Sequence, residues 1–246
     1  MVRFFAAKSD ISDTMIKLSA QDASHIRSLR LRPSELFIVC DGEGLDYICR
    51  LAATRAQETG DVFAEILEAG SSLGEPSVRC SVFIAFAKGD RLDYAVQKSV
   101  ELGAHDIKLF PSERCVSVPG DISKKTDRLQ KIAMETAKQC GRGIVPEITA
   151  LDSFKSAVGL AVLADLPLFF YECEKKLGLG AALDQRTAYS TVSIFTGPEG
   201  GFEPHEAEFA QAEGMLAVSL GSRILRCETA PVAVLAAIML HSGNLA

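Results

Sequence analysis

The sequence contains no tryptophan and only four histidines, and aromatic residues make up 7% of its 246 positions. The histidines are scattered, so neither a Ser-His-Asp triad nor a metal site has local support. Seven cysteines are an odd number at irregular spacings, and none of them forms a CxxC pair. We interpret them as small buried apolar residues of a protein kept in a reducing compartment, with no metal and no disulfide framework expected.

Long apolar runs and a strong net charge are also missing. The longest apolar run, residues 230–240, is about half of the roughly 20 residues that a membrane helix needs, so we expect a buried helix there and no membrane partner. The segment MVRFFAAKSD lacks the apolar core of a signal peptide, and we expect a cytoplasmic location. The formal net charge of -6 argues against coating of nucleic acid but leaves room for a local basic patch.

The composition, with 48% apolar and 24% charged residues, is that of a globular protein with a substantial core in one or two domains. The first 70 residues are rich in short β-type runs separated by turn signals, which predicts a small barrel. These runs are residues 3–6, 15–18, 36–40, 47–53 and 61–67. Residues 20–31 have helix character, and the densest basic cluster of this half lies there and just after: His25, Arg27, Arg30 and Arg32. The cluster is either a solvated helix face or a contact surface for RNA phosphates.

Residues 69–76 contain small residues and a proline that interrupt both periodicities, so we predict a linker there and domains at 1–73 and 74–246. Apolar strand-type runs then alternate with segments of helical spacing. The predicted strands are 82–87, 107–110, 161–164, 168–171, 192–195 and 216–220, and the predicted helices are 92–103, 129–140, 204–213 and 228–241. This alternation predicts an α/β domain with a parallel sheet between helices.

Two loops follow predicted strands of this domain. The first, residues 196–201 (TGPEGG), is glycine-rich and lies at the carboxyl end of a strand, where open α/β sheets bind their ligands, although a plain turn is an equal interpretation. It fits neither phosphate-loop pattern. The second, residues 220–230 (LGSRILRCETA), leads into the last helix. Glu228 or Thr229 could cap that helix, but capping does not explain the two arginines, so we expect a function for at least one of them.

At this spacing the two loops resemble the RsmE family of ribosomal RNA (uracil-N3)-methyltransferases, which belongs to the SPOUT class. Further segments carry the same resemblance, and together they span essentially the whole chain. They are Arg3-Phe4-Phe5, residues 25–31, 88–91 (KGDR), 97–103 (QKSVELG), 112–115 (SERC), 139–142 (QCGR) and 146–148 (PEI). Two positions depart from the family pattern: Cys227 stands where threonine is usual, and Lys138 stands where glutamate is frequent.

The resemblance implies a PUA-like RNA-binding β-barrel followed by a SPOUT domain tied in a trefoil knot. It also implies S-adenosylmethionine bound within the knotted loops, and a homodimer. The family's cofactor-binding positions fall on Thr196, Gly197, Glu199, Gly200, Gly201, Leu220, Gly221, Ile224, Leu225, Thr229 and Ala230.

The implied reaction must remove the N3 proton of uracil and place negative charge on the two flanking carbonyl oxygens. A guanidinium suits that charge, because arginine stays protonated and offers several donors in one plane. We expect Arg226 to fill this role, with Arg142 and Arg114 as further candidates. Glu228 and Glu199 are candidates for the base, and helix capping or loop structure explains them equally well. For guiding RNA we expect Arg3, His25, Arg27, Arg30 and Arg32.

The leading hypothesis is therefore methylation of N3 of a uridine in 16S ribosomal RNA. The acidic net charge favours the assembled 30S subunit as the substrate. Two alternatives stay open at this point: a SPOUT ribose 2'-O-methyltransferase acting on RNA, and a non-catalytic RNA-binding factor of ribosome assembly.

Overall fold

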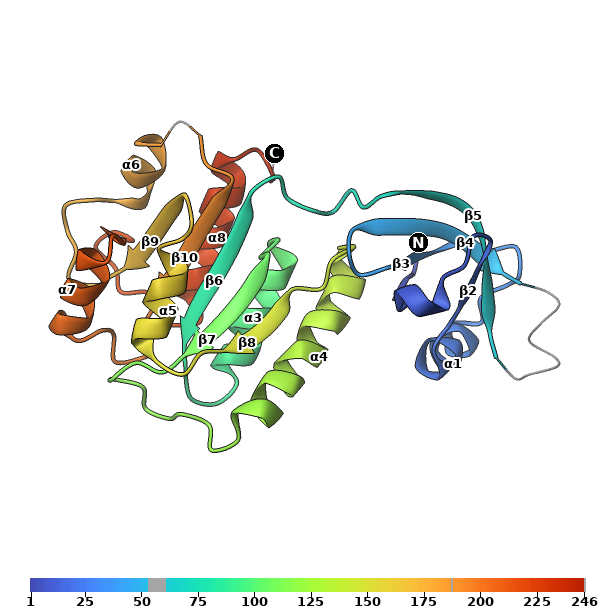
Figure 1. Cartoon of the computed structure of the whole chain (residues 1–246), viewed down its shortest axis with the longest axis horizontal. Coiled ribbons are helices and arrows are strands. Elements are labelled where there is room, and N and C mark those ends of the chain that lie inside the picture. The colour runs from blue at the N-terminus through green and yellow to red at the C-terminus, as the bar shows by residue number, and fades with distance from the viewer. Residues whose placement is uncertain (53–60, 187, 246) are drawn as a thin grey trace. The chain divides into compact units, whose positions relative to one another are not determined.

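The computed structural model describes residues 1–52, 61–186 and 188–245. The chain divides into two compact units (Figure 1). The first unit combines Met1–Glu75 with Ala137–Val145, and the second combines Pro76–Thr136 with Pro146–Ala246. Within the described ranges, none of the helices has the length and apolar character needed to cross a membrane.

The first unit is built on a five-stranded sheet with the strand order β1-β3-β4-β5-β2. Only β1 and β3 are parallel, and the other neighbours pair antiparallel. The strands are β1 (Arg3–Phe5), β2 (Met15–Lys17), β3 (Phe37–Cys40), β4 (Leu45–Leu51) and β5 (Phe63–Ser71), and a short 3-10 helix, η1 (Lys8–Asp10), precedes β2. Residue 53, the last of the predicted 47–53 strand, lies outside the described residues.

Helix α1 (Ala20–Leu29) contributes to the core of this sheet. The Ser19 side chain accepts a hydrogen bond from the Asp22 backbone N–H and so caps the helix, and Arg30, in the left-handed region at φ 54°, ends it. Ile26 of α1 packs into an apolar cluster with Phe4 and Phe37 from the sheet. The opposite face of α1 stays exposed and carries Arg27.

Residues 137–145 belong to the first unit, although the predicted boundary after residue 73 assigned them to the second domain. A buried ion pair explains this placement. Arg142, 3% exposed, donates to Glu75, with Nη2 2.7 Å from Oε2. The backbone N–H groups of Gly143 and Ile144 donate to the other oxygen of Glu75, each at 3.0 Å. One carboxylate therefore holds the whole turn after helix α4 (Ile122–Cys140).

The second unit is a six-stranded sheet with the order β11-β9-β10-β6-β7-β8, and every neighbouring pair is parallel. This confirms the predicted α/β architecture with a parallel sheet. The strands are β6 (Arg79–Ala85), β7 (Asp106–Phe110), β8 (Glu147–Ala150), β9 (Leu166–Phe170), β10 (Thr191–Thr196) and β11 (Leu216–Val218). The helices are α3 (Arg91–Glu101), α4 (Ile122–Cys140), α5 (Phe154–Ala161), α6 (Leu179–Asp184), α7 (Pro204–Ala212) and α8 (Thr229–His241).

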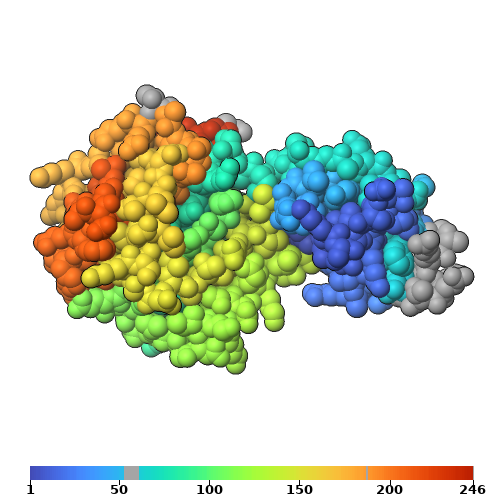
Figure 2. All heavy atoms as spheres, in the orientation of Figure 1, coloured from blue at the N-terminus to red at the C-terminus, as the bar shows by residue number. Residues whose placement is uncertain are grey.

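Helices cover both faces of this sheet (Figure 1). On one face, α5 and α7 pack against a cluster of phenylalanines from the strands, including Phe83, Phe110 and Phe195, and the space-filling view shows these two helices over the sheet (Figure 2). On the other face, α8 packs against β6, β10 and α3. Because both faces are buried, the strands are continuous apolar runs rather than alternating ones.

One predicted strand is wrong. Residues 161–164 lie at the end of α5 and in the turn after it, and the strand begins at Leu166. The chain is helical up to Ala161 because Ala157, Val158 and Ala161 recur at helical spacing on the phenylalanine cluster, and residues 162–164 form the turn that follows. In the described part of the second unit, three elements were not predicted: α5, α6 and β8.

The strand order determines where loops meet. Since β11, β9 and β10 are adjacent and parallel, their carboxyl ends lie at the same edge of the sheet. The segments after these strands therefore converge there, although they are separated in the sequence.

Candidate active site

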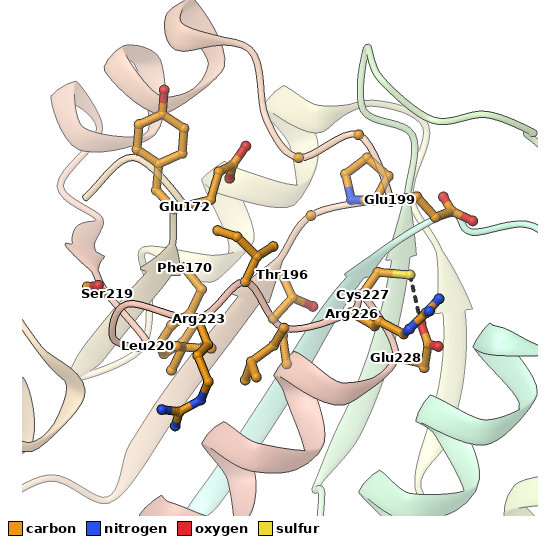
Figure 3. Close-up of a pocket in the computed structure, with 18 of the residues that line it drawn as sticks. Phe170, Glu172, Thr196, Glu199, Ser219, Leu220, Arg223, Arg226, Cys227 and Glu228 are labelled. Atoms are coloured by element: carbon orange, nitrogen blue, oxygen red, sulfur yellow. Dashed lines mark hydrogen bonds between the residues drawn. The ribbon is translucent and has the colours of Figure 1, made fainter. Parts of the chain in front are cut away.

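A pocket of about 480 Å³ lies where those three segments converge, within the size range of small-molecule sites (Figure 3). Its wall is formed by residues after β9, after β10 and between β11 and α8, together with Arg91 of α3. The lining residues are Arg91, Phe170, Tyr171, Glu172, residues 196–201, residues 218–221, residues 223–228 and Ala230. Backbone, apolar side chains, three arginines and three glutamates thus surround one cavity.

The glycine-rich segment after β10 is shaped by close packing. Gly201 has φ +70°, and a Cβ at this position would lie 1.8 Å from Oε1 of Glu172. A Cβ at Gly197 would lie 3.0 Å from the ring of Phe202. The Gly201 N–H donates to the Pro198 carbonyl at 3.0 Å and closes the turn. Glycine is required here because the backbone lies directly against its neighbours.

Glu199 is the most strongly engaged carboxylate of the pocket. Its Oε1 accepts hydrogen bonds from the Lys88 backbone N–H, at 2.8 Å, and from the Arg91 guanidinium. Burial favours the protonated acid, but these hydrogen bonds outweigh burial and hold the pKa of Glu199 below its usual range. Its Oε2 is buried and has no hydrogen-bond partner among the described residues. Glu199 is thus an ionised carboxylate whose Oε2 atom is still able to accept a hydrogen bond.

In the segment before α8, hydrogen bonds fix the backbone of Arg226. The Arg226 carbonyl accepts hydrogen bonds from the N–H groups of Thr229 and Ala230, at 2.9 and 3.0 Å. Its side chain is exposed, and no acidic partner for it or for Arg223 occurs in the described part of the chain. In the close-up the Arg226 side chain extends beside Glu228, whereas Arg223 extends in another direction (Figure 3). An unpartnered guanidinium at a pocket can bind charge that a ligand brings.

Cys227 lies between these groups and is only 8% exposed. Its thiol donates to Oε2 of Glu228 at 3.2 Å (Figure 3). Burial, together with this hydrogen bond, raises the pKa of Cys227 to about 12. The group is therefore a neutral thiol at physiological pH and is unsuited to act as a nucleophile.

Several known proteins are similar to this chain over most of its length. The RNA methyltransferase domain family matches residues 74–239. Ribosomal RNA small subunit methyltransferase E of Synechocystis is 32% identical over 96% of this chain and 76% of its own length, and that of Bacillus subtilis is 29% identical over 97% and 96%. The crystal structure of ribosomal RNA small subunit methyltransferase E from Neisseria gonorrhoeae bound to S-adenosyl methionine matches with a TM-score of 0.83, 31% identity and 98% coverage of both chains.

The chain belongs to the ribosomal RNA small subunit methyltransferase E family. This confirms the family resemblance of its motifs. The predicted cofactor positions, with one exception, line the pocket described above: Thr196, Gly197, Glu199, Gly200, Gly201, Leu220, Gly221, Ile224, Leu225 and Ala230. The exception is Thr229, which is exposed at the first turn of α8 and is not part of the pocket wall.

The predicted catalytic candidates lie at different places in the structure. Arg226, Glu228 and Glu199 line the pocket. Arg114 lies behind the glycine-rich segment, where it pairs with Glu203 at 2.6 Å and donates to the Gly200 carbonyl at 3.1 Å, so it supports the loop rather than lining the cavity. Arg142 belongs to the first unit and is paired there with Glu75. This pair contributes to the folding of the first unit, and the catalytic role of Arg142 stays a prediction.

The predicted RNA-binding residues also differ in their exposure and partners. The Arg3 side chain is 10% exposed and donates to Asp46 Oδ1 and to Cys40 Sγ, each at 2.8 Å. Its guanidinium links β1 to β3 and β4, and its contact with RNA stays a prediction. The other candidates of this set are exposed on α1 or just after it: His25, Arg27, Arg30 and Arg32.

Several pocket residues were missed from the sequence. Phe170 ends β9, Tyr171 and Glu172 follow it, and no motif marks them. Only the strand order reveals that β9 lies between β10 and β11. Arg91 was noticed only within the KGDR motif, without a role. Its position just after the first strand of the second unit was the available signal, because ligands bind beyond strand ends in such sheets.

Proposed function

We propose that this protein transfers a methyl group from S-adenosylmethionine to N3 of a uridine in 16S ribosomal RNA. The observation that carries the proposal is the meeting of the 196–201 and 220–230 loops in one pocket that also holds the unpartnered Arg226. The family membership supports the reaction class and the cofactor. A family member from Neisseria gonorrhoeae has been solved with S-adenosyl methionine bound.

The residues of the pocket fit this cofactor. Apolar side chains from Leu220, Ile224 and Leu225 offer contacts for an adenine ring, and the glycine-rich backbone offers N–H and C=O groups at close range. The Oε2 atom of Glu199, which has no hydrogen-bond partner among the described residues, suits a positively charged ligand. When bound, S-adenosylmethionine supplies a methyl group on a cationic sulfur, ready for attack by a nucleophile.

Arg226 and Glu228 provide the protein's side of the chemistry in this proposal. Loss of the N3 proton moves negative charge onto the uracil carbonyl oxygens, and the planar guanidinium of Arg226 donates hydrogen bonds to that charge. Glu228 is the candidate acceptor of the N3 proton, because its carboxylate lines the pocket beside Arg226. Arg114 acts indirectly, by supporting Gly200.

The remaining parts of the proposal concern the whole molecule. The first unit, with its boundary near residue 73, is a PUA-like RNA-binding domain that uses His25, Arg27, Arg30 and Arg32. The β10–α8 region is tied in the SPOUT trefoil knot, and two copies of the chain form a homodimer. The substrate is the assembled 30S subunit, in the cytoplasm. The exposed basic side chains on α1 support RNA binding by electrostatic contact with phosphates.

The decisive experiment supplies labelled S-adenosylmethionine to 30S subunits that lack the modification, with naked 16S RNA in parallel. We expect label in 3-methyluridine after digestion to nucleosides, and more of it from 30S subunits. Label on a ribose 2'-oxygen would replace the proposal with the 2'-O-methyltransferase alternative. Cofactor binding without transfer to either RNA would favour the non-catalytic assembly factor.

A further inference from the structure

A second, more open cavity of about 530 Å³ adjoins the pocket. It is lined by Lys88, Gly89, Asp90, Arg91, Tyr94 and Glu228. Two of these residues, Arg91 and Glu228, also line the first pocket. The two cavities are therefore contiguous, and a ligand in the second would lie next to a cofactor in the first.

The floor of this groove is held in place from the first pocket. Glu199 accepts hydrogen bonds from the Lys88 backbone N–H and from Arg91, and Arg91 Nε lies 3.8 Å from Glu228 Oε2. These contacts fix the turn between β6 and α3 to the glycine-rich segment after β10. The groove is thus a preformed surface, and its position relative to the first pocket is set by the partly buried carboxylate of Glu199.

Two side chains at the groove are left available for a ligand. Tyr94, in the first turn of α3, is 49% exposed, and Lys88 is exposed. Neither the Tyr94 hydroxyl nor the Lys88 ammonium has a hydrogen-bond or ion-pair partner among the residues that the structure describes. An exposed aromatic ring beside an unpaired cation is the combination that binds single-stranded nucleotides, because the base stacks on the ring and the phosphate meets the cation.

We propose that this groove receives the target nucleotide, with the uracil ring stacked on Tyr94 and its phosphate at Lys88. The inference rests on the proposed function, and it identifies the substrate subsite of that reaction. A base held there presents its edge to Glu228, which lies at the junction of the two cavities. The nucleotide must be unpaired or turned out of its stack, since a base in a helix cannot lie on a tyrosine ring. Arg91 is a positioning residue in this scheme.

The test compares Tyr94→Ala with Tyr94→Phe on whichever RNA the wild-type protein methylates. We expect Tyr94→Ala to raise KM for the RNA by about tenfold or more, the effect of losing one stacked base, and Tyr94→Phe to stay within about twofold. Affinity for S-adenosylmethionine, measured by calorimetry without RNA, stays unchanged in both variants. Leu163→Ala, an exposed apolar residue after α5 on the other side of the sheet, is the matched control and leaves KM unchanged.

Lys88→Gln tests the phosphate contact separately. We expect it to reduce the salt dependence of RNA binding by about one unit in the slope of log affinity against log salt. Lys155→Gln, an exposed lysine on α5, is the control and leaves the slope unchanged.

The outcomes distinguish a failure of the groove proposal from a failure of the proposed function. A wild-type protein that methylates neither RNA rejects the proposed function. A wild-type protein that makes 3-methyluridine while Tyr94→Ala keeps its KM rejects only the groove. Loss of cofactor affinity or a change in oligomeric state in Tyr94→Ala would overturn the inference too, by assigning Tyr94 to the cofactor pocket or to assembly.

Discussion

At the scale of single residues, the arginines of this protein differ by their partners rather than by their chemistry. Four of them pair with carboxylates from distant parts of the chain and so join separate segments: Arg3 with Asp46, Arg91 with Glu199, Arg114 with Glu203 and Arg142 with Glu75. Arg223 and Arg226 line the pocket with no acidic partner in the described part of the chain. The sequence could not separate the two groups, because each partner lies far along the chain.

Arg226→Ala tests the catalytic assignment. We expect kcat for methyl transfer to fall by about 10² to 10³, the typical cost of losing one donor to a developing negative charge, while affinity for S-adenosylmethionine changes little. Arg226→Lys keeps the charge but loses the planar arrangement of donors, so it recovers only part of the rate. Arg223→Ala is the matched variant, since Arg223 lines the same pocket but extends in another direction, and it keeps most of kcat. Wild-type turnover in Arg226→Ala would refute the assignment.

Cysteine reactivity follows from burial and pKa. Because burial raises the pKa of Cys227 to about 12, its thiol stays largely protonated up to pH 10, so its alkylation is slow and its rate still rises with pH at pH 10 instead of levelling off. Cys173 is exposed, contrary to the expectation that all seven cysteines are buried. We expect iodoacetamide to modify Cys173 first and to leave Cys227 intact in the folded protein, as mapped by mass spectrometry.

Cys227→Ala should keep the rate of methyl transfer within about threefold of the wild-type rate. A larger loss would give the thiol a role in the reaction.

At the scale of elements, the pocket is assembled by the order of strands. The two loops at 196–201 and 220–230 could be predicted, because glycines and arginines directly follow apolar strands. The third wall, residues 170–172, could not be predicted, because nothing local indicates that β9 lies between β11 and β10. The wrong strand at 161–164 has a similar cause: a short apolar run fits a buried helix as well as a buried strand until its packing partners are known.

Gly201→Ala tests the close packing of the glycine-rich segment. Gly201 and Gly214 both have positive φ, but a Cβ at Gly201 would collide with Glu172, whereas a Cβ at Gly214 has no atom within 4 Å. Both substitutions should cost about 1 to 2 kcal/mol of unfolding free energy through backbone strain, measured by urea titration. Only Gly201→Ala should also weaken S-adenosylmethionine binding, by tenfold or more in calorimetry, since Glu172 must move within the pocket wall. Equal cofactor affinity in the two variants would contradict this account.

At the scale of the whole molecule, the two units do not follow the order of the chain. A linker near residue 73 could be predicted from small residues and a proline. The return of residues 137–145 to the first unit could not, because it depends on an ion pair between Glu75 and Arg142, 67 positions apart. Through Arg142, the QCGR motif thus makes a contact that holds the first unit together.

Glu75→Gln tests that structural role. The amide can still accept hydrogen bonds from the Gly143 and Ile144 N–H groups, but it no longer balances the charge of the buried Arg142. We expect a loss of about 3 kcal/mol in unfolding free energy, since breaking one side of a buried ion pair is far costlier than breaking an exposed one. Glu65→Gln is the control, because its pair with Arg50 in the same unit is half-exposed, and it should change stability little. Well below the melting temperature, kcat of Glu75→Gln should match that of the wild type. A stable Glu75→Gln protein that loses kcat would instead return Arg142 to the catalytic machinery.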